Sequence, residues 1–371
     1  MKKIVIYFFA TVTINSVAKS QNSVLTTAVP YLRIAADGRA SGMGDAGITA
    51  TPDAASIFWN GAKSLFAEKK MAAQLTYTSW FREVGAKDIY LLSASGYKQI
   101  DEVSSITGGI RYYSQGTINV TSVSGDPLGS FKPRDWDISA GYNRKLNNKM
   151  GVGVTLRFIN SALGGASSSS GGLSSTSSSL AGDVSFYYKG ENKEGAGWNW
   201  GVSVSNLGGK MGYAGTASTD KDFLPANLGI GGSYGWVFEE KHKIRASLEI
   251  NKLLVPAWPN LTGNASSDSA NAAEYRKRTV VNSWFSSFSD GSGLFQSLAY
   301  SIGGEYMYDH KFGARMGYYT EDQIRGNRKY FTAGLSAYFK GGGVHLSYLI
   351  PAANSNRNIL NNTIRFGIVF E

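Results

Sequence analysis

The sequence contains no cysteine. This absence excludes a disulfide framework, a thiol nucleophile, a thiolate metal site and the lipid-modified cysteine of a lipoprotein. Histidine is also scarce, since it occurs only at His242, His310 and His345. Few side chains are therefore left for metal or redox chemistry, and the sequence predicts no metal site, no cofactor and no catalytic centre.

Charge and long apolar runs are the next things the chain has little of. Charged residues make up 17% of it, whereas aromatic residues reach 13% and glycine occurs 45 times. After Gln21 there is no run of about 18 apolar residues, so no transmembrane helix is expected. A soluble protein of this length normally carries more charge. Abundant Tyr, Phe and Gly with little charge is typical of strands that face lipid on one side and water on the other.

The formal net charge of +10 raises the question of a nucleic-acid partner. The basic residues are scattered, however, and Arg276-Lys277-Arg278 forms the one cluster. Exported proteins rarely meet nucleic acid. We therefore expect no nucleic-acid partner.

The first twenty residues are typical of a secretory signal peptide. Lys2 and Lys3 precede an apolar stretch over residues 4–12, and Ala18-Lys19-Ser20 supplies small residues before a cut. The apolar stretch is too short to cross a bilayer as a helix. We predict a signal peptide over 1–20 with cleavage before Gln21; a first strand or a buried helix is the alternative.

From about residue 71 to the end, apolar and polar residues alternate with period two. Met150, Val152 and Val154 share one parity, for example, while Gly151, Gly153 and Thr155 share the other. Such alternation indicates strands with two different solvents on their faces. The pattern predicts an all-β fold of fourteen antiparallel strands, an even number as a closed bacterial barrel requires. The strands lie near 71–79, 88–98, 104–114, 135–145, 149–160, 180–189, 197–206, 226–238, 242–252, 298–308, 311–319, 329–340, 342–351 and 362–371.

The connections between these strands alternate in length. Short turns such as 146–148 and 239–241 follow every second strand, and most of the other connections are long. Short turns on one side and long loops on the other are typical of an outer-membrane barrel. We therefore predict a multi-pass barrel in the cell outer membrane over 71–371, with both of its ends periplasmic and the long loops extracellular. The long loops are 115–134, the Ser/Gly-rich and flexible 161–179, 207–225 and 253–297.

Six charged residues inside the predicted strands fall consistently on the parity opposite to the apolar side chains. Facing lipid at the bilayer midplane, each Arg would cost about 2–4 kcal/mol. We therefore assign this parity to the interior, which predicts a wet or plugged lumen. The residues are Arg111, Arg157, Arg245, Glu249, Glu305 and Arg365.

Residues 21–70 do not alternate and are rich in small residues and glycine. Such a segment suits a compact plug inside the barrel, and Pro52 with Asp53 can start a short helix running towards Trp59. The glycine spacing does not indicate a phosphate-binding loop, because no strand precedes it and no Lys-Ser/Thr follows it. The residues expected to form the luminal plug are Arg39, Gly42, Gly44, Asp45, Phe58, Trp59 and Asn60.

Two runs in this segment resemble the PorV family, namely residues 39–47 (RASGMGDAG) and 53–60 (DAASIFWN). That family comprises outer-membrane barrels of the type IX secretion system of Bacteroidetes and is similar to FadL-type transporters. The motif is fairly specific for the PorV/PorQ/FadL-like group and less so for PorV alone. The chain departs from the family pattern at Asn60-Gly61-Ala62, where the family has Asn-Pro-Ala, and the loss of proline frees φ at that turn.

The resemblance implies a FadL-like, fourteen-stranded barrel plugged by its N-terminal segment, among outer-membrane lipid and lipopolysaccharide. It also implies a non-enzymatic role in protein secretion. The implied partners are a large translocon barrel, the C-terminal domains of cargo proteins and a PorU-like sortase that receives the cargo.

The loop 253–297 carries aromatic residues among Ser, Asn and Gly, which often act as contact anchors for a partner. These residues are Trp258, Trp284, Phe285, Phe288 and Phe295. They could instead cover the barrel mouth or belong to the interfacial aromatic girdle. One further function stays open, a FadL-type transporter of hydrophobic small molecules. His345 and Ser347 share the inward parity, as a hydrolase acting on lipid A would need, but the favoured interpretation of each is a lone polar residue of the lumen.

Overall fold

The computed structural model describes residues 27–80, 88–163, 176–213, 221–259, 262–289, 293, 295–352 and 363–371. The predicted signal peptide over 1–20 and the centre of the Ser/Gly-rich loop 161–179 lie outside these residues. None of the helices in the described parts is both long and apolar enough to cross a bilayer.

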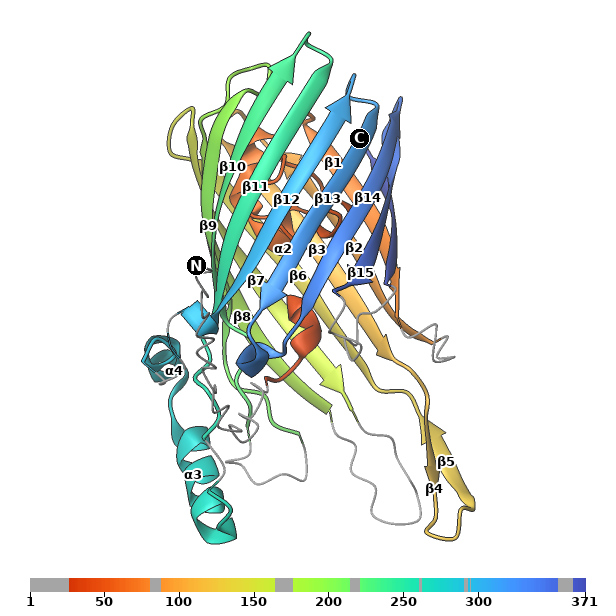
Figure 1. Cartoon of the computed structure of the whole chain (residues 1–371), viewed down its shortest axis with the longest axis vertical. Helices are drawn as coiled ribbons and strands as arrows, with labels where there is room; N and C mark the ends of the chain where they lie inside the picture. The colour runs from red at the N-terminus through yellow and green to blue at the C-terminus, as the bar shows by residue number, and fades with distance from the viewer. Residues whose placement is uncertain are drawn as a thin grey trace, which may run out of the picture.

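The described chain forms a closed antiparallel β-barrel, as Figure 1 shows. Fourteen strands follow one another around the wall, and the first pairs with the last over Ala73–Ser79 and Ile364–Phe370. The predicted fold class is therefore confirmed, and each predicted strand is present. The strands are β1 Met71–Ser79, β2 Ile89–Gln99, β3 Ser104–Gln115, β6 Arg134–Lys145, β7 Met150–Ala162, β8 Thr176–Lys189, β9 Gly197–Gly208, β10 Asn227–Phe238, β11 His242–Leu253, β12 Leu298–Tyr308, β13 Phe312–Glu321, β14 Lys329–Phe339, β15 Gly342–Pro351 and β16 Ile364–Phe370.

The wall is continuous apart from one shift of register in the described strands. It lies between Gly182 and Val184 of β8, where the strand pairs with β9. The carboxylate of the skipped residue, Asp183, accepts hydrogen bonds from Arg157 and from the backbone N–H of Asn206. This buried network fills the bulge, so the irregularity does not open the wall.

The two faces of the wall differ as the alternation predicts. The six charged residues assigned to the interior are all buried, and large apolar side chains such as Leu75, Leu156 and Leu335 are exposed on the outside. Aromatic side chains also lie on the outer face, where the rings of Tyr188 and Trp200 stack with their centres 5.7 Å apart. Because the exposed face is apolar and the inner face polar, hydrocarbon is the solvent that this outer surface fits.

Leu156 offers a direct test of that outer surface, because its side chain is 75% exposed in the middle of β7. Leu156→Arg should destabilise the folded barrel in lipid bilayers by about 2–4 kcal/mol, the cost of placing Arg near the midplane. Val123→Arg, at an exposed loop position, is the matched control and should cost less than about 0.5 kcal/mol. Denaturant unfolding in liposomes measures both, and equal costs would contradict the lipid-facing assignment.

The segment before β1 folds inside the barrel (Figure 1). It forms four short helices: η1 Pro30–Arg33, α1 Gly38–Ser41, α2 Ser56–Trp59 and η2 Gly61–Phe66. α1 contacts β14, β15 and β16, whereas η2 contacts β6, β7 and β8 across the lumen. Helix α2 begins at Ser56 and not at Pro52, because Asp53 bonds the Ala55 N–H and the Ser56 hydroxyl in a turn. The plug therefore spans the barrel from wall to wall.

The long connections lie together at one end of the barrel and the short turns at the other (Figure 1). The loop after β3 contains a hairpin, β4 Ile118–Thr121 and β5 Pro127–Phe131. The loop after β11 contains α3 Ala265–Lys277, α4 Val280–Ser286 and η4 Phe295–Ser297, and η5 Gln323–Arg325 follows β13. The hairpin and these helices project beyond the wall and enlarge the surface at the long-loop end.

Candidate functional site

One buried ion pair ties the first plug helix to the wall. Arg39 of α1 donates from Nε and Nη2 to the two carboxylate oxygens of Glu305 on β12, at 2.9 and 2.8 Å. Arg315 on β13 donates to the same carboxylate at 2.7 Å. Charge-assisted, bidentate hydrogen bonds of this kind are short and strong. Each of the charges would be costly to bury without its partner. Release of the plug would separate Arg39 from Glu305 and leave buried charges unpaired, so this ion pair holds the plug in the lumen.

A second residue, Asp37, organises the plug itself. One carboxylate oxygen accepts the backbone N–H groups of Arg39 and Ala40, at 2.9 and 2.8 Å, and so caps α1. The other oxygen accepts the indole N–H of Trp59 at 2.6 Å. Asp37 therefore fixes α1 against α2. Sequence analysis missed this role, although an Asp directly before Gly38-Arg39-Ala40 is a signal for a helix cap.

The plug turn over residues 47–49 is tied to the wall and to the following helix. Glu249 on β11 accepts the backbone N–H groups of Ile48 and Thr49. Lys63 of η2 donates to the carbonyl oxygen of Gly47 at 2.5 Å. Burial lowers the pKa of Lys63, while the nearby carboxylate of Asp53 acts in the opposite direction. This part of the plug is thus bonded on both sides.

The turn at Gly44 and Asp45 packs against β13 and β14. Gly44 has a φ of +68°, and an added Cβ would lie 2.6 Å from the backbone N of Tyr318, so only glycine fits. Its N–H bonds Thr332 Oγ1 at 2.8 Å, and Asp45 accepts the Tyr330 hydroxyl at 2.5 Å. Burial raises the pKa of Asp45, which the positive charge of Arg365 partly counteracts.

Other predicted plug residues are bonded in the same manner. Asn60 donates to the carbonyl of Phe186 on β8 at 2.8 Å, and Gly42 lies against the backbone of Gly334 on β14. The ring of Phe58 stacks under Arg111, 5.1 Å from the guanidinium carbon. With Arg39, Gly44, Asp45 and Trp59, these residues fill the lumen.

A row of alternating charges lines the opposite wall. Arg111 on β3 pairs with Asp137 on β6 at 2.8 Å, and Arg157 on β7 pairs with Asp183 on β8 at 2.8 Å. Tyr31 of η1 donates its hydroxyl to Asp137 at 3.0 Å. The positive and negative charges balance along the row, so the luminal wall presents little net charge to the plug.

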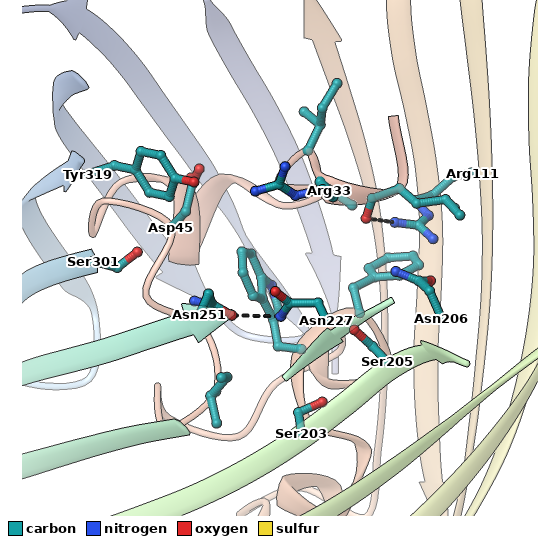
Figure 2. A pocket seen from close by; sticks show the side chains of 16 residues that line it. Arg33, Asp45, Arg111, Ser203, Ser205, Asn206, Asn227, Asn251, Ser301 and Tyr319 are labelled. Carbon is teal, nitrogen blue, oxygen red and sulfur yellow. Dashed lines mark hydrogen bonds between the residues drawn. The ribbon is translucent and has the colours of Figure 1, made fainter. Parts of the chain in front are cut away.

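A cavity of about 100 Å³ lies inside the plugged barrel. Plug residues 32–36 and 45–59 border it on one side, and strands β9 to β13 supply Asn, Ser and Tyr side chains on the other, as Figure 2 shows. Asn227 donates to the Asn251 side-chain oxygen at 2.8 Å. The apolar part of its lining comes from the plug residues Leu32, Ile34, Ala36, Ile48, Phe58 and Trp59. The cavity is therefore mixed in polarity and small.

A larger cavity, about 670 Å³, opens at the short-turn end. Its floor is plug residues 51–54, and charged side chains from six turns and strand ends line its walls, among them Lys189, Lys243 and Glu191. A hydrophobic molecule of fatty-acid size would meet charges in this vestibule. Neither cavity resembles the largely apolar pocket that binds such molecules.

At the long-loop end, α3 packs on the barrel rim through aromatic residues. Tyr275 is buried between Phe223 and Trp258, with ring centres 5.6 and 4.6 Å away. Lys210 donates to the carbonyl oxygens of Arg276 and Arg278, both at 2.6 Å. Trp258 is thus partly used for packing within the chain. This agrees with the alternative that aromatic residues of the loop 253–297 cover the barrel mouth.

Helix α4 presents an exposed apolar face. Its serine face, Ser283 and Ser287, is buried, and Lys252 from the end of β11 bonds the Ser287 carbonyl at 2.7 Å. Thr279 caps its first turn. The opposite side carries Val281 and Phe285, with Phe285 71% exposed. Phe288, which follows the helix, and Phe295 of η4 are 49% and 78% exposed. Trp284 is half-buried beside them. The loop therefore holds several aromatic side chains in water on a fixed support.

The family model described as "Type IX secretion system protein PorV" matches residues 17–260, well over half of the chain. The chain belongs to the PorV family. It is accordingly an outer-membrane component of the type IX secretion system. A comparison with curated proteins finds no match.

Solved structures show the same architecture as this PorV-family chain. The toluene transporter TbuX of Ralstonia pickettii has a TM-score of 0.54 at 11% identity, covering 90% of this chain and 97% of its own. The toluene transporter TodX of P. putida has a TM-score of 0.53 at 12% identity, with coverages of 90% and 97%. At these identities the likeness establishes the FadL-like fold and nothing about the cargo.

The hydrolase alternative finds no support in the geometry of the PorV-family barrel. His345 and Ser347 both face inward on β15, but the described residues contain no hydrogen bond between them. The Ser347 hydroxyl instead lies 2.8 Å from the hydroxyl of Ser41 in the plug. A nucleophile and its base must lie within hydrogen-bonding reach. The matching family model describes a secretion system protein, and TbuX is described as a toluene transporter.

Proposed function

We propose that this PorV-family barrel acts in type IX secretion by binding proteins at its long-loop end. In this proposal it associates with a large translocon barrel, accepts the C-terminal domain of cargo proteins and passes them to a PorU-like sortase. The long loops face the cell exterior, both ends of the chain lie in the periplasm, and the wall sits among outer-membrane lipid and lipopolysaccharide.

The observation that carries the proposal is the exposed aromatic face of α4. Isolated apolar side chains are common on surfaces, but several large ones on one short, fixed element mark a contact site. The plug supports the same conclusion, because the buried bonds of Arg39 with Glu305 and of Thr49 with Glu249 hold it in the lumen. A barrel that is filled in this way offers its outer loops, and not a pore, to other molecules.

A FadL-type transporter of hydrophobic small molecules is the second candidate, and the fold shared with TbuX and TodX favours it. A transporter needs an apolar cavity with a path through the wall. The charged vestibule and the filled bulge at Asp183 argue against such a path. The secretion role is therefore the better supported of the two.

The test is affinity purification of the tagged, full-length protein from outer membranes in mild detergent. The proposal expects a much larger barrel protein and secreted cargo with a shared C-terminal domain in the eluate. An unrelated barrel of similar size, tagged and expressed at the same level, is the control. Recovery of the bait alone, in more than one detergent, would sink the proposed function.

A further inference from the structure

The cavity of about 100 Å³ contains polar side-chain atoms without a hydrogen-bond partner among the residues that the structure describes (Figure 2). Ser301 is fully buried on β12, yet its hydroxyl has no partner in the described parts of the chain. One carboxylate oxygen of Asp45 is likewise unpartnered and buried. Native proteins satisfy nearly all buried polar groups, so such atoms point to a bound molecule or to ordered water.

The amide pair on β10 and β11 adds a donor next to an acceptor. The side-chain nitrogen of Asn227 donates to the side-chain oxygen of Asn251. The side-chain oxygen of Asn227 and the side-chain nitrogen of Asn251 therefore keep free hydrogen-bonding capacity. The hydroxyls of Ser203 and Ser205 on β9 line the same wall. The cavity therefore offers several donors and acceptors at fixed positions and in mixed order.

The charged groups at the cavity lie near opposite charges of the chain itself. Arg33 pairs with Glu321 at 3.5 Å and Arg111 pairs with Asp137 at 2.8 Å. The Asp45 carboxylate lies in the field of the positively charged Arg365 and Arg328. An ionic ligand would therefore bring an uncompensated charge into a buried site. A neutral ligand with several hydroxyl groups would not, and the rings of Phe58 and Trp59 suit the apolar face of such a molecule.

We propose that this cavity is a binding site for a neutral sugar ring, a single pyranose with its hydroxyls on Asn227, Asn251 and Ser301. At roughly 10–15 Å³ for each water molecule, a cavity of about 100 Å³ holds about seven to ten of them, which is room for one ring and not for a chain. Its polar wall is built from the long-loop ends of β9, β10 and β11, so the ligand enters from the long-loop end. The site is separate from α4 and does not depend on the proposed secretion role.

Ligand-observed NMR and calorimetry on the detergent-purified full chain test this site. The probes are the methyl glycosides of D-glucose, D-mannose and N-acetyl-D-glucosamine, with D-glucuronate as an anionic counterpart and toluene as an apolar one. At least one neutral glycoside should bind saturably, and the glucuronate and toluene should not compete with it. The sugar ring could be the end of a glycan or a free monosaccharide, and maltotriose distinguishes the two. If maltotriose binds as tightly as the methyl glucoside, the ligand is the end of a glycan; if it binds more weakly, the ligand is a free sugar.

Matched variants make the assignment specific. Asn251→Leu combined with Ser301→Ala keeps the volume nearly unchanged and should weaken glycoside binding about tenfold or more. Ser95→Ala is the control, because Ser95 is also buried on the inner wall with an unpartnered hydroxyl but does not line the cavity. If no glycoside bound saturably at millimolar concentrations, water would be the only occupant of the cavity. That result would overturn the proposal. Toluene binding in the cavity, or equal affinity in all variants, would overturn it as well.

Discussion

Replacing Glu305 with alanine is expected to loosen the plug and admit ions through the barrel. The substitution leaves Arg39 and Arg315 buried without their shared carboxylate. Breaking a buried ion pair by removing one partner typically costs about 3–5 kcal/mol. In planar bilayers the wild-type barrel should be silent, whereas Glu305→Ala should show frequent channel openings and a lower midpoint of denaturant unfolding.

Glu194→Ala is the matched control for this experiment, because Glu194 is an exposed glutamate in the turn between β8 and β9. It should leave both conductance and unfolding unchanged. Glu305→Gln keeps the shape but loses the charge, so it should fall between the wild type and the alanine variant. A silent and fully stable Glu305→Ala barrel would show that the ion pair does not hold the plug.

The second large effect is expected at the α4 face. Phe285→Ser with Phe288→Ser removes two exposed aromatic side chains and leaves the buried serine face untouched. Aromatic anchors at interface centres each contribute about 2 kcal/mol or more, so partner recovery should fall at least about tenfold. Quantitative mass spectrometry of affinity eluates measures this, and secretion of cargo into the medium should fall with it.

Asn282→Ala on the same helix is the control, since its side chain is exposed and polar. Both proteins should reach the outer membrane in equal amounts and show the same shift in mobility on heating, because neither substitution touches the wall. If the double serine variant retained its partners at the wild-type level, the contact site would have to lie elsewhere on the loops.

The strands were predictable because each is a short run of sequence in which one face meets lipid and the other meets the polar lumen. The alternation around Met150–Phe158 specifies a face for every residue, and a shift by one residue would turn Arg157 towards lipid. The helices of the long loop were not predicted, because α3 consists mainly of small and polar residues and has no apolar stripe to detect. The caps at Asn264 and Thr279 were the signals that could have indicated them.

The site was predictable in kind but not in detail. Small residues and glycine in 39–47 indicate a segment under tight packing, and Gly44 meets that expectation against Tyr318. The pairing of Arg39 with Glu305 joins residues 266 positions apart, and no local pattern encodes it. The unpartnered polar groups around Asn251 and Ser301 arise only where the strands β9 to β13 and the plug converge.

The central claim is that the barrel works through its outer surface while its lumen stays closed, and a reversible lock on the plug tests it most directly. Ser41 in α1 and Ser347 on β15 have hydroxyl oxygens 2.8 Å apart, and the chain contains no other cysteine to interfere. Ser41→Cys with Ser347→Cys should form a disulfide in the oxidising environment of the outer membrane. The account predicts that cells with the locked barrel as sole copy secrete cargo at the wild-type rate, with each single cysteine variant as control. Secretion that stops in the locked barrel and returns on reduction would contradict it.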